Sequence, residues 1–264
     1  MRNIFWVEMK RAWNVSCMIG IIGIFFSICF DSWNDLIQAL QIHRGNVHYF
    51  FFNSAWGGVC RTYFLPVFAT FPFATSFCKE YSTHALPYII TREGKKNYCI
   101  TKYIINALCG GLIVAIATAL LFIVLSAIFP MTDVSCQGAV VSDRFHTWIA
   151  VHHPFQYGII ETVSGFLRGM IWASVSLCIS LYISDPLVVM VSPYLFSFAF
   201  VQLCRILRIE DTYRLDMLLT GNMVIKSSNY TIGICTIASI AIVTILGIMF
   251  EKKVLRGLKD GKFY

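Results

Sequence analysis

The chain has 264 residues, of which 57% are hydrophobic and only 13% are charged, and its mean hydropathy is +0.68. This composition excludes an ordinary water-soluble surface and predicts a single all-α integral membrane domain over residues 1–264. The net charge of +7 does not indicate nucleic-acid binding, because the Lys and Arg residues lie between apolar runs, where they orient helices in a membrane.

Residues 1–14 mix aromatic and aliphatic side chains with Glu8 and three basic residues. This mixture predicts a short N-terminal helix lying in the headgroup layer of the membrane. No small-residue cleavage site follows. The first apolar run, about 15–30, is therefore interpreted as a retained membrane span and not as a signal peptide.

The second apolar run, about 60–78, contains Pro66 and Pro72. Each proline lacks a backbone donor, so we expect a kinked second span. Aromatic residues follow one stripe of this span; they are Phe64, Phe68 and Phe71.

The segment 78–102, CKEYSTHALPYIITREGKKNYCITK, is the longest charged passage between two strongly apolar runs on the more basic face. Ser82 and Thr83 are residues that cap helices, and Gly94 is suited to end one. A short helix is therefore expected between spans two and three. Its apolar face is formed by residues at i, i+3 and i+4, namely Leu86, Ile89 and Ile90.

Four more apolar runs complete a model of six spans, at about 103–129, 162–184, 187–204 and 231–250. Asp185-Pro186 predicts a very tight turn between the fourth and fifth spans. In this arrangement the face that carries both termini has thirteen Lys and Arg residues and the opposite face has seven. The excess predicts that both termini are cytosolic, in a multi-pass protein of the plasma membrane, most simply a bacterial cytoplasmic membrane.

Residues typical of a catalytic or metal centre are scarce. The sequence has no HExxH, no GxSxG and no GxxxxGK[ST] motif. The adjacent His152 and His153 have no Cys or carboxylate at ligand spacing, which favours a solvated pair over a metal site. We therefore expect neither an enzyme nor a metal or cofactor bound by this chain. Cys60 and Cys136 are the pair that could meet on the outer side.

Arg168 is the one cation placed deep in a span, where insertion of a charge at the helix centre costs about 2.5–3.5 kcal/mol. Glu161, seven residues earlier on the same face, is a candidate partner. Arg168 either extends to the outer headgroups or belongs to a polar substrate path. It also lies within a GxxxG pattern, Gly165 to Gly169, which predicts close helix packing within the monomer.

Aromatic residues of the second and fifth spans could line a path for an apolar or amphipathic substrate. The candidates are Phe64, Phe68, Phe71 and Tyr194, together with Arg168. The alternative is that these side chains face lipid or the helix core, as aromatic stripes commonly do.

The segment after the second span resembles that of ABC-2 type permeases, the membrane subunits of one class of ATP-driven transporter. In that family the second span ends in a Phe/Ser-rich turn. A Glu, a short helix with Thr or Leu, an Arg and a Lys at the start of the third span follow. The residues at these places here are Glu80, Thr83, Leu86, Arg92 and Lys102. The departure is His84, where the family usually has Gly.

The resemblance implies that the short helix is a coupling helix seated in a groove of a separate ATP-binding cassette ATPase, which holds the ATP and Mg²⁺. The coupling residues would be Glu80, Thr83, His84, Leu86, Ile89, Ile90 and Arg92. It also implies a second, identical or related permease subunit, and export as the direction of transport.

Three interpretations follow for the function. A permease of an ATP-driven exporter of an amphipathic or hydrophobic substrate, such as a peptide or lipid, accounts for the inner segment. An ion-coupled carrier or channel is weakened by the near absence of carboxylates in the spans. A membrane-embedded enzyme would have little more to use than Arg168, Glu161 and the two histidines.

Overall fold

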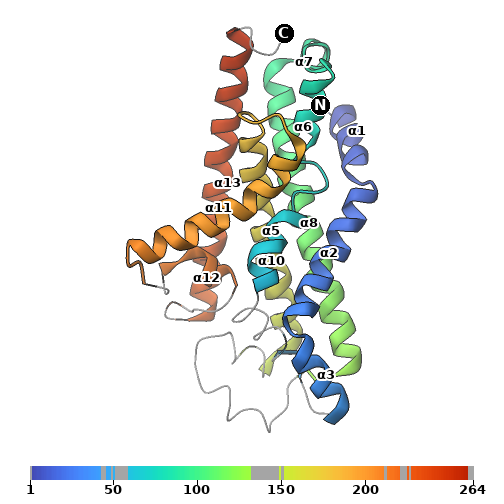
Figure 1. Ribbon diagram of the computed structural model, residues 1–264, viewed down its shortest axis with the longest axis vertical. Helices are drawn as coiled ribbons and strands as arrows, with labels where there is room; N and C mark the ends of the chain where they lie inside the picture. Colours follow the sequence, from blue (N-terminus) through green and yellow to red (C-terminus); the bar gives the residue numbers. More distant parts are fainter. Residues whose placement is uncertain are drawn as a thin grey trace.

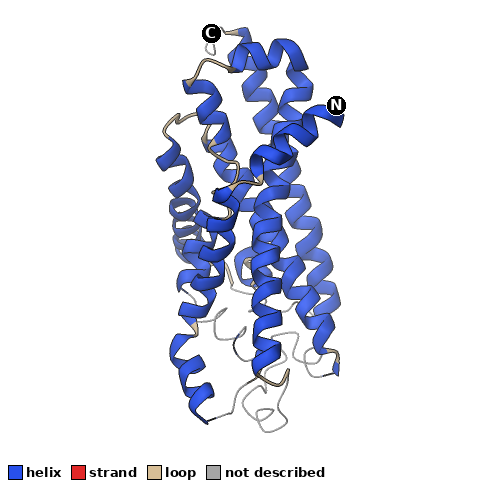
Figure 2. Cartoon of the chain, turned by 90° about the vertical axis from the view of Figure 1, so that its right-hand side faces the viewer, coloured by secondary structure: helices blue, strands red, loops and turns tan. Residues whose placement is uncertain are grey.

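The computed structural model describes residues 2–42, 46–48, 50, 59–131, 149, 152–210, 213–220, 225 and 227–260. Every regular element within these ranges is a helix (Figure 2), which confirms the expected all-α fold. The helices run in chain order as α1 (Arg2–Ala12), α2 (Val15–Asp31), α3 (Trp33–Ile42), α5 (Val59–Phe68), α6 (Ser76–Ser82), α7 (Leu86–Glu93), α8 (Lys95–Ile128), α10 (Pro154–Ile179), α11 (Pro186–Ile206), α12 (Leu215–Leu219) and α13 (Ser228–Lys259).

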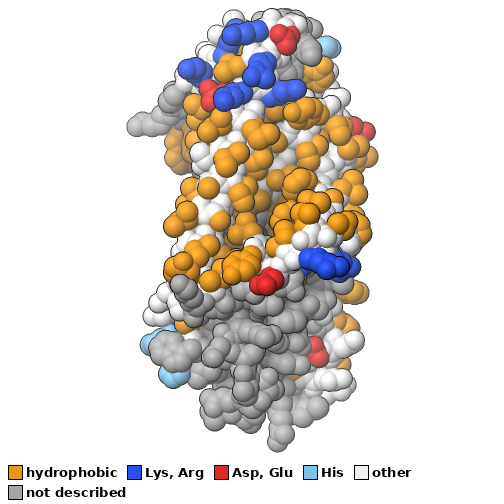
Figure 3. All heavy atoms as spheres, turned by 90° about the vertical axis from the view of Figure 1, so that its left-hand side faces the viewer, with side chains coloured by type: hydrophobic (Ala, Val, Ile, Leu, Met, Phe, Trp, Pro, Cys, Tyr) orange, Lys and Arg blue, Asp and Glu red, His pale blue; other side chains and the backbone are white. Residues whose placement is uncertain are grey.

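Four of these helices, α8, α10, α11 and α13, are long and apolar enough to cross a membrane. They correspond to the expected third to sixth spans. α8 begins before the expected third span, at Lys95, and α13 continues past the expected sixth span to Lys259. On the face of the molecule drawn in Figure 3, hydrophobic side chains form a belt, and Lys and Arg side chains gather above it. The chain is therefore a helical, membrane-spanning protein.

The first expected span is the 17-residue helix α2, which begins where Asn14 accepts a hydrogen bond from the Ser16 amide at 2.8 Å. The helix α1 precedes it and bends away from it by 53°. If this bent pair is counted as one crossing, the described chain has five spans. The break at residues 13 and 14 matches the expected boundary between an N-terminal helix and the first span.

The second expected span is not one helix. α5 ends at Phe68, residues 69–75 form turns, and α6 begins at Ser76. Pro72 cannot donate a backbone hydrogen bond and disfavours helical geometry in the residue before it. Irregular backbone at membrane depth is tolerated where protein buries it, and Ala69 and Thr70 are fully buried. The expected kink is therefore a complete break.

Two glycines make room for this break. A Cβ at Gly20 of α2 would lie 3.1 Å from the carbonyl oxygen of Phe68, and one at Gly110 of α8 would lie 3.0 Å from that of Ala69. Neither helix could approach the turn so closely with a larger residue. The broken segment is thus held between α2 and α8.

α11, in contrast, continues through Pro193. The carbonyl of Val189, which a residue other than proline at 193 would have bonded, accepts the hydroxyls of Ser192 at 2.8 Å and Ser176 at 2.7 Å. These two bonds replace the missing one. Ser176 belongs to α10, so the proline also ties α11 to its neighbour.

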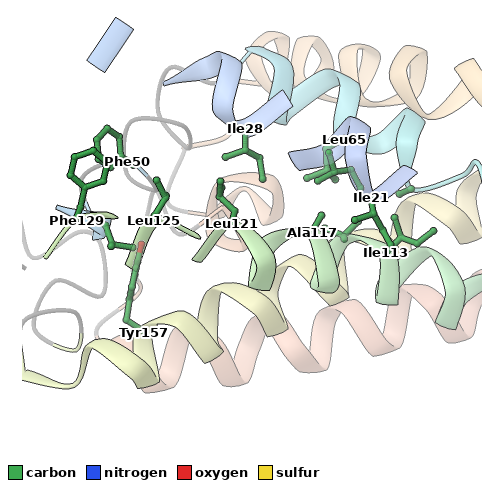
Figure 4. Close-up of a cluster of buried hydrophobic side chains, with 14 of the residues drawn as sticks. Ile21, Ile28, Phe50, Leu65, Ile113, Ala117, Leu121, Leu125, Phe129 and Tyr157 are labelled. Carbon is green, nitrogen blue, oxygen red and sulfur yellow. The ribbon is translucent and has the colours of Figure 1, made fainter. Parts of the chain in front are cut away.

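The centre of the bundle is the crossing of α8 and α10. A Cβ at Gly169 would lie 2.4 Å from the carbonyl oxygen of Gly110, and one at Gly165 would lie 3.0 Å from the Thr118 hydroxyl. This confirms the close packing expected from the GxxxG pattern. On the other side of α8, Figure 4 shows Ile21 and Ile28 of α2 beside the apolar face of α8, labelled at Ile113, Ala117 and Leu121.

The described ends of the chain meet at one end of the molecule. Figure 1 places the N-terminal helix α1, the tip at α7 and the C-terminal end of α13 together at the top. The last turns of α13 carry four exposed basic residues, Lys252, Lys253, Arg256 and Lys259. We call this region the basic end, and it contains the segment 78–102.

Candidate functional site

The segment 78–102 folds as a helical hairpin at the basic end. α6 ends in a turn in which the His84 amide donates to the Tyr81 carbonyl at 3.1 Å and the Ala85 amide donates to the Glu80 carbonyl at 3.0 Å. This pair of bonds is a Schellman motif, which places its C′ residue in the left-handed region. That residue is His84, with φ of 54°. Gly has no Cβ penalty in this region, so the one departure from the family pattern lies where the backbone favours glycine.

The short helix that follows is α7. Gly94, with φ of 82°, ends it and donates its amide to the Ile90 carbonyl at 2.9 Å, as the sequence predicts. The expected caps at its start are wrong. The hydroxyls of Ser82 and Thr83 donate back to the Lys79 carbonyl of α6, at 3.0 and 2.8 Å, and α7 begins after Ala85 without a side-chain cap.

The apolar face of α7 points into the protein. Leu86 is fully buried, Ile90 is 5% exposed and Ile89 packs partly buried beside them. Their neighbours come from α6, α8, α10 and α13; they are Phe77, Tyr98, Leu177, Phe250, Val254 and Leu258. The expectation that Leu86, Ile89 and Ile90 form an apolar face available to a partner is therefore corrected. The face exists, but the chain's own helices cover it.

The surface that the hairpin offers outward is polar and aromatic. Tyr88 is 79% exposed, and the Arg92 side chain is exposed to the same extent. We define the α6–α7 tip as the exposed residues of the two helices and their turn: Lys79, Tyr81, Ser82, Thr83, His84, Tyr88, Thr91 and Arg92. Of the predicted coupling residues, Thr83, His84 and Arg92 belong to this tip.

Glu80 lies behind the tip, in a buried cluster of charges. The Lys102 Nζ atom of α8 donates to Glu80 Oε1 at 2.6 Å and lies 3.5 Å from Glu8 Oε2 of α1. Tyr98 donates its hydroxyl to Glu80 Oε2 at 2.6 Å. The Lys102 ammonium also lies 4.6 Å from the centre of the Phe73 ring, a favourable cation–π distance. We call Glu8, Glu80, Tyr98 and Lys102 the charge cluster.

The charge cluster joins three elements that are far apart in the sequence. Arg11 of α1 donates to Glu8 at 2.7 Å and lies 4.0 Å from Glu80, so two carboxylates face two cations. A buried charge is tolerated where it is paired and hydrogen-bonded in this way. The cluster thereby fixes α1 and α6 to the first turns of α8. Glu80 and Lys102, which match the family pattern, bond to each other and not to an outside partner.

Glu93 is a third carboxylate near this cluster. Its side chain is 7% exposed and lies 3.6 Å from the Arg92 guanidinium. Burial raises the pKa of Glu93 above its usual value, and the negative charge of Glu8 raises it further, while Arg92 opposes the shift. The pKa of Glu93, the last residue of α7, therefore depends on the charge of Glu8 as well as on its own burial.

The residues predicted to line a substrate path lie in three places. Phe64 and Tyr194 approach each other with ring centroids 6.5 Å apart, whereas Phe68 stacks on Phe71 at 5.5 Å and packs against Gly23 of α2. Arg168 is on neither surface. It lines a separate cavity between α5, α10, α11, α12 and α13, so the structure does not join the five residues into one path.

The tight turn before α11 is present. Asp185 caps α11 by accepting a hydrogen bond from the Leu187 amide at 2.8 Å, and Pro186 occupies the first turn. A polar hollow of about 400 Å³ lies between this turn, α6 and the end of α13, and its lining includes Tyr81, Lys253 and Arg256. The hollow therefore borders the α6–α7 tip.

Three further features of the sequence concern metal ligands, the two adjacent histidines and a possible disulfide. No group of three or more His, Cys, Asp or Glu in the described ranges has the geometry of a metal site. His152 and His153 are exposed at the start of α10. The pairing of Cys60 with Cys136 falls outside the described residues.

Glu8 and Tyr98 were not predicted as members of the site. The signal in the sequence was weak: Glu8 is a carboxylate in a helix of mainly basic and apolar residues, and nothing local indicates that Lys102 would reach it.

Comparison with known proteins gave no match to a family model, a curated protein or a solved structure. The interpretation of the site therefore rests on its geometry and on the residues of the segment 78–102.

Proposed function

We propose that this chain is the membrane-spanning permease subunit of an ATP-driven transporter of the ABC-2 type. In this proposal α2 and the broken α5–α6 segment add two crossings to the four long helices, giving six spans with both termini in the cytosol. The four exposed basic residues at the end of α13 support that orientation. The protein would lie in the plasma membrane, most simply the cytoplasmic membrane of a bacterium.

The observation that carries the proposal is the construction of α7. Its outer side belongs to the exposed α6–α7 tip, while Leu86 and Ile90 belong to a buried apolar cluster that includes residues of α8, α10 and α13. A force applied to the tip is thus transmitted to two membrane helices through buried side chains. The charge cluster adds α1 and α8 to the same rigid group. A helix that merely set topology would need none of these connections.

The partner that fits the tip is an ATP-binding cassette ATPase, which would supply ATP and Mg²⁺. The tip would occupy its groove through Thr83, His84, Tyr88 and Arg92, and Leu86, Ile89 and Ile90 would act from behind as the link to the bundle. Alternation between two states of the bundle then follows ATP binding and release. A second permease subunit would complete the complex, and the cargo would be an exported amphipathic or hydrophobic molecule.

Co-expression tests the assignment of the tip. The tagged full-length chain is expressed with each ATP-binding cassette ATPase encoded in its own genome, and the ATPase that co-purifies in detergent is identified. We expect Tyr88→Asp and Arg92→Ala to reduce that co-purification at least about tenfold, because both side chains are exposed on the tip. ATP-dependent transport should fall in parallel.

The matched control is Tyr213→Asp, another exposed tyrosine, which lies between α11 and α12 and should leave the complex intact. Leu86→Asp is unsuitable as a test of contact, since Leu86 is fully buried and its replacement would unfold the hairpin. If no ATPase co-purifies, or if transport runs on an ion gradient without ATP, the permease proposal is wrong.

A further inference from the structure

A cavity of about 360 Å³ lies between α5, α10, α11, α12 and α13. Its walls are mainly apolar and include Trp172, Phe200, Ile242 and Leu246. Phe196, which is half exposed on α11, also contributes to the lining. Ligand pockets are commonly concave and apolar, with a few polar groups that fix orientation.

The polar residues of this lining come from several elements; they are Thr62 of α5, Arg168 of α10, Ser197 of α11, and Asp216 and Thr220 at α12. Arg168 and Asp216 are the only charged residues among the described residues of the cavity. Val175 lies seven residues beyond Arg168 on α10, about 10 Å along the helix axis in the direction of the basic end. Along α10, the wall of the cavity therefore runs from the charged Arg168 to the apolar Val175.

Asp216 is already held by another residue. Arg214, at the start of α12, donates to both of its carboxylate oxygens, at 3.3 and 2.8 Å, so the charge of Asp216 is matched outside the cavity. The guanidinium of Arg168 carries a permanent positive charge and five N–H donors, and can therefore bond an incoming anion in addition to protein groups. An ammonium group at the same place would be repelled by it.

We propose that this cavity is a binding site for a single-chain amphiphile with an anionic head, such as a carboxylate. The head lies at Arg168 and the chain extends between Trp172, Phe200 and Leu246 toward Val175. A volume of about 360 Å³ is at the lower end of the range of ~300–1,000 Å³ for small-molecule pockets, which favours one chain over the two chains of a phospholipid. As the substrate class of a transporter, this inference rests on the proposed function; as a binding site, it stands without it.

The binding test uses the purified full-length chain in nanodiscs of zwitterionic lipid, with dodecanoate as the probe. Dodecyltrimethylammonium and dodecanol have the same chain and differ in the charge of the head. Titration calorimetry against empty nanodiscs separates binding to the protein from partition into lipid. We expect saturable binding of dodecanoate, at least about tenfold weaker binding of dodecanol, and no saturable binding of the ammonium compound.

Variants locate the site. Arg168→Gln should weaken dodecanoate binding about tenfold and leave dodecanol binding unchanged, and Arg168→Lys should restore part of the loss, because charge alone is retained. Arg205→Gln is the matched control, since Arg205 is exposed on α11. Because Arg168→Gln could also perturb folding, Leu246→Trp provides a second test: it fills space between the apolar walls, keeps Arg168, and should abolish binding of both dodecanoate and dodecanol.

Equal binding of dodecanoate and dodecanol, or dodecanoate binding that survives both Arg168→Gln and Leu246→Trp, would overturn the inference. These measurements require no ATPase. Their failure is therefore distinguishable from failure of the permease proposal, which is judged by co-purification and ATP-dependent transport.

Discussion

Lys102 and Arg168 are both buried cations, with 1% and 6% of their surfaces exposed, and they lie in the packed helices α8 and α10. Their surroundings differ. Lys102 is enclosed by Glu80, Glu8 and the Phe73 ring, whereas Arg168 lies along the wall of a cavity of about 360 Å³. The first cation joins helices, and we propose that the second, in addition to its protein contacts, meets a ligand in the cavity. A buried charge in a membrane helix is thus interpreted from what surrounds it, and each change below tests one side of this contrast.

The largest effect is expected from Lys102→Met. The substitution leaves the Glu8 and Glu80 carboxylates buried without their shared cation, and breaking a buried pair in this way costs about 3–5 kcal/mol. Unfolding of the full-length chain in detergent, followed by tryptophan fluorescence, measures the loss. The control is Lys96→Met, since Lys96 is exposed near the start of the same helix and should change stability by less than about 0.5 kcal/mol.

Arg168→Gln sharpens the same comparison. The cavity beside Arg168 is large enough to admit water, so the groups around it can be rehydrated when the guanidinium is removed. We expect a smaller loss of stability than for Lys102→Met, under the same unfolding assay. A loss as large as that of Lys102→Met would show that both cations are structural and would end the distinction.

The next effect concerns the crossing of α8 and α10, where Gly169, the residue after Arg168, makes a close contact. A Cβ at Gly169 would be 2.4 Å from the Gly110 carbonyl oxygen, so Gly169→Leu must separate the helices, at a cost of about 1–3 kcal/mol for overpacking. Gly233→Leu is the matched control, because a Cβ at Gly233 of α13 meets no atom within 4 Å. Thermal unfolding of the two variants should differ, and similar melting temperatures would contradict the close packing.

A smaller effect is expected at the basic end from Glu93→Gln. The pKa of Glu93 is raised in the folded protein, so the folded state holds this proton more tightly than the unfolded state does. Its contribution to stability is therefore full below the usual value of 4.5 and is lost as pH rises through the raised pKa. Glu93→Gln removes that loss.

The measurement is thermal unfolding of the wild type and Glu93→Gln from pH 4 to pH 8. The two should be equally stable near pH 4, and the variant should become the more stable one above pH 4.5. A difference between them that does not depend on pH would contradict the assigned shift. Glu251→Gln, at the end of α13, supplies a carboxylate control outside α7.

The four long apolar helices, the tight turn at Asp185-Pro186 and the close approach at Gly165 and Gly169 were predictable because each depends on residues near one another in the sequence. The short helix α7 and its end at Gly94 were predictable for the same reason. For residues 69–75 the sequence predicted a kink and not the complete break that the structure shows. Proline indicates a kink, but the extent of the break depends on Gly20 and Gly110 from two other helices.

The residues that cover the apolar face of α7 could not be predicted from the sequence. Periodicity shows that Leu86, Ile89 and Ile90 share one side of α7, but Phe250 and Val254, which cover that side, lie more than 150 residues later. The same holds for Lys102 and Glu8, and for the cavity at Arg168, which depends on the placement of α12. In each case the side chains that decide the role of a residue come from a distant part of the chain.

The smallest effect is expected at His84, whose left-handed backbone costs a non-glycine residue about 1–2 kcal/mol, partly offset by the greater entropy that Gly loses on folding. His84→Gly should therefore raise stability by less than about 1 kcal/mol, whereas His84→Val should lower it. Arg208 closes an equivalent motif at the end of α11, with φ of 52° and the Ile209 amide donating to the Cys204 carbonyl at 3.0 Å. Arg208→Gly should give a similar gain in stability, measured by thermal unfolding.

If His84 contacts an ATPase, only His84→Gly should also weaken co-purification, since Arg208 lies far from the α6–α7 tip. Loss of the complex with both variants, or with neither, would contradict a role of the His84 imidazole in coupling.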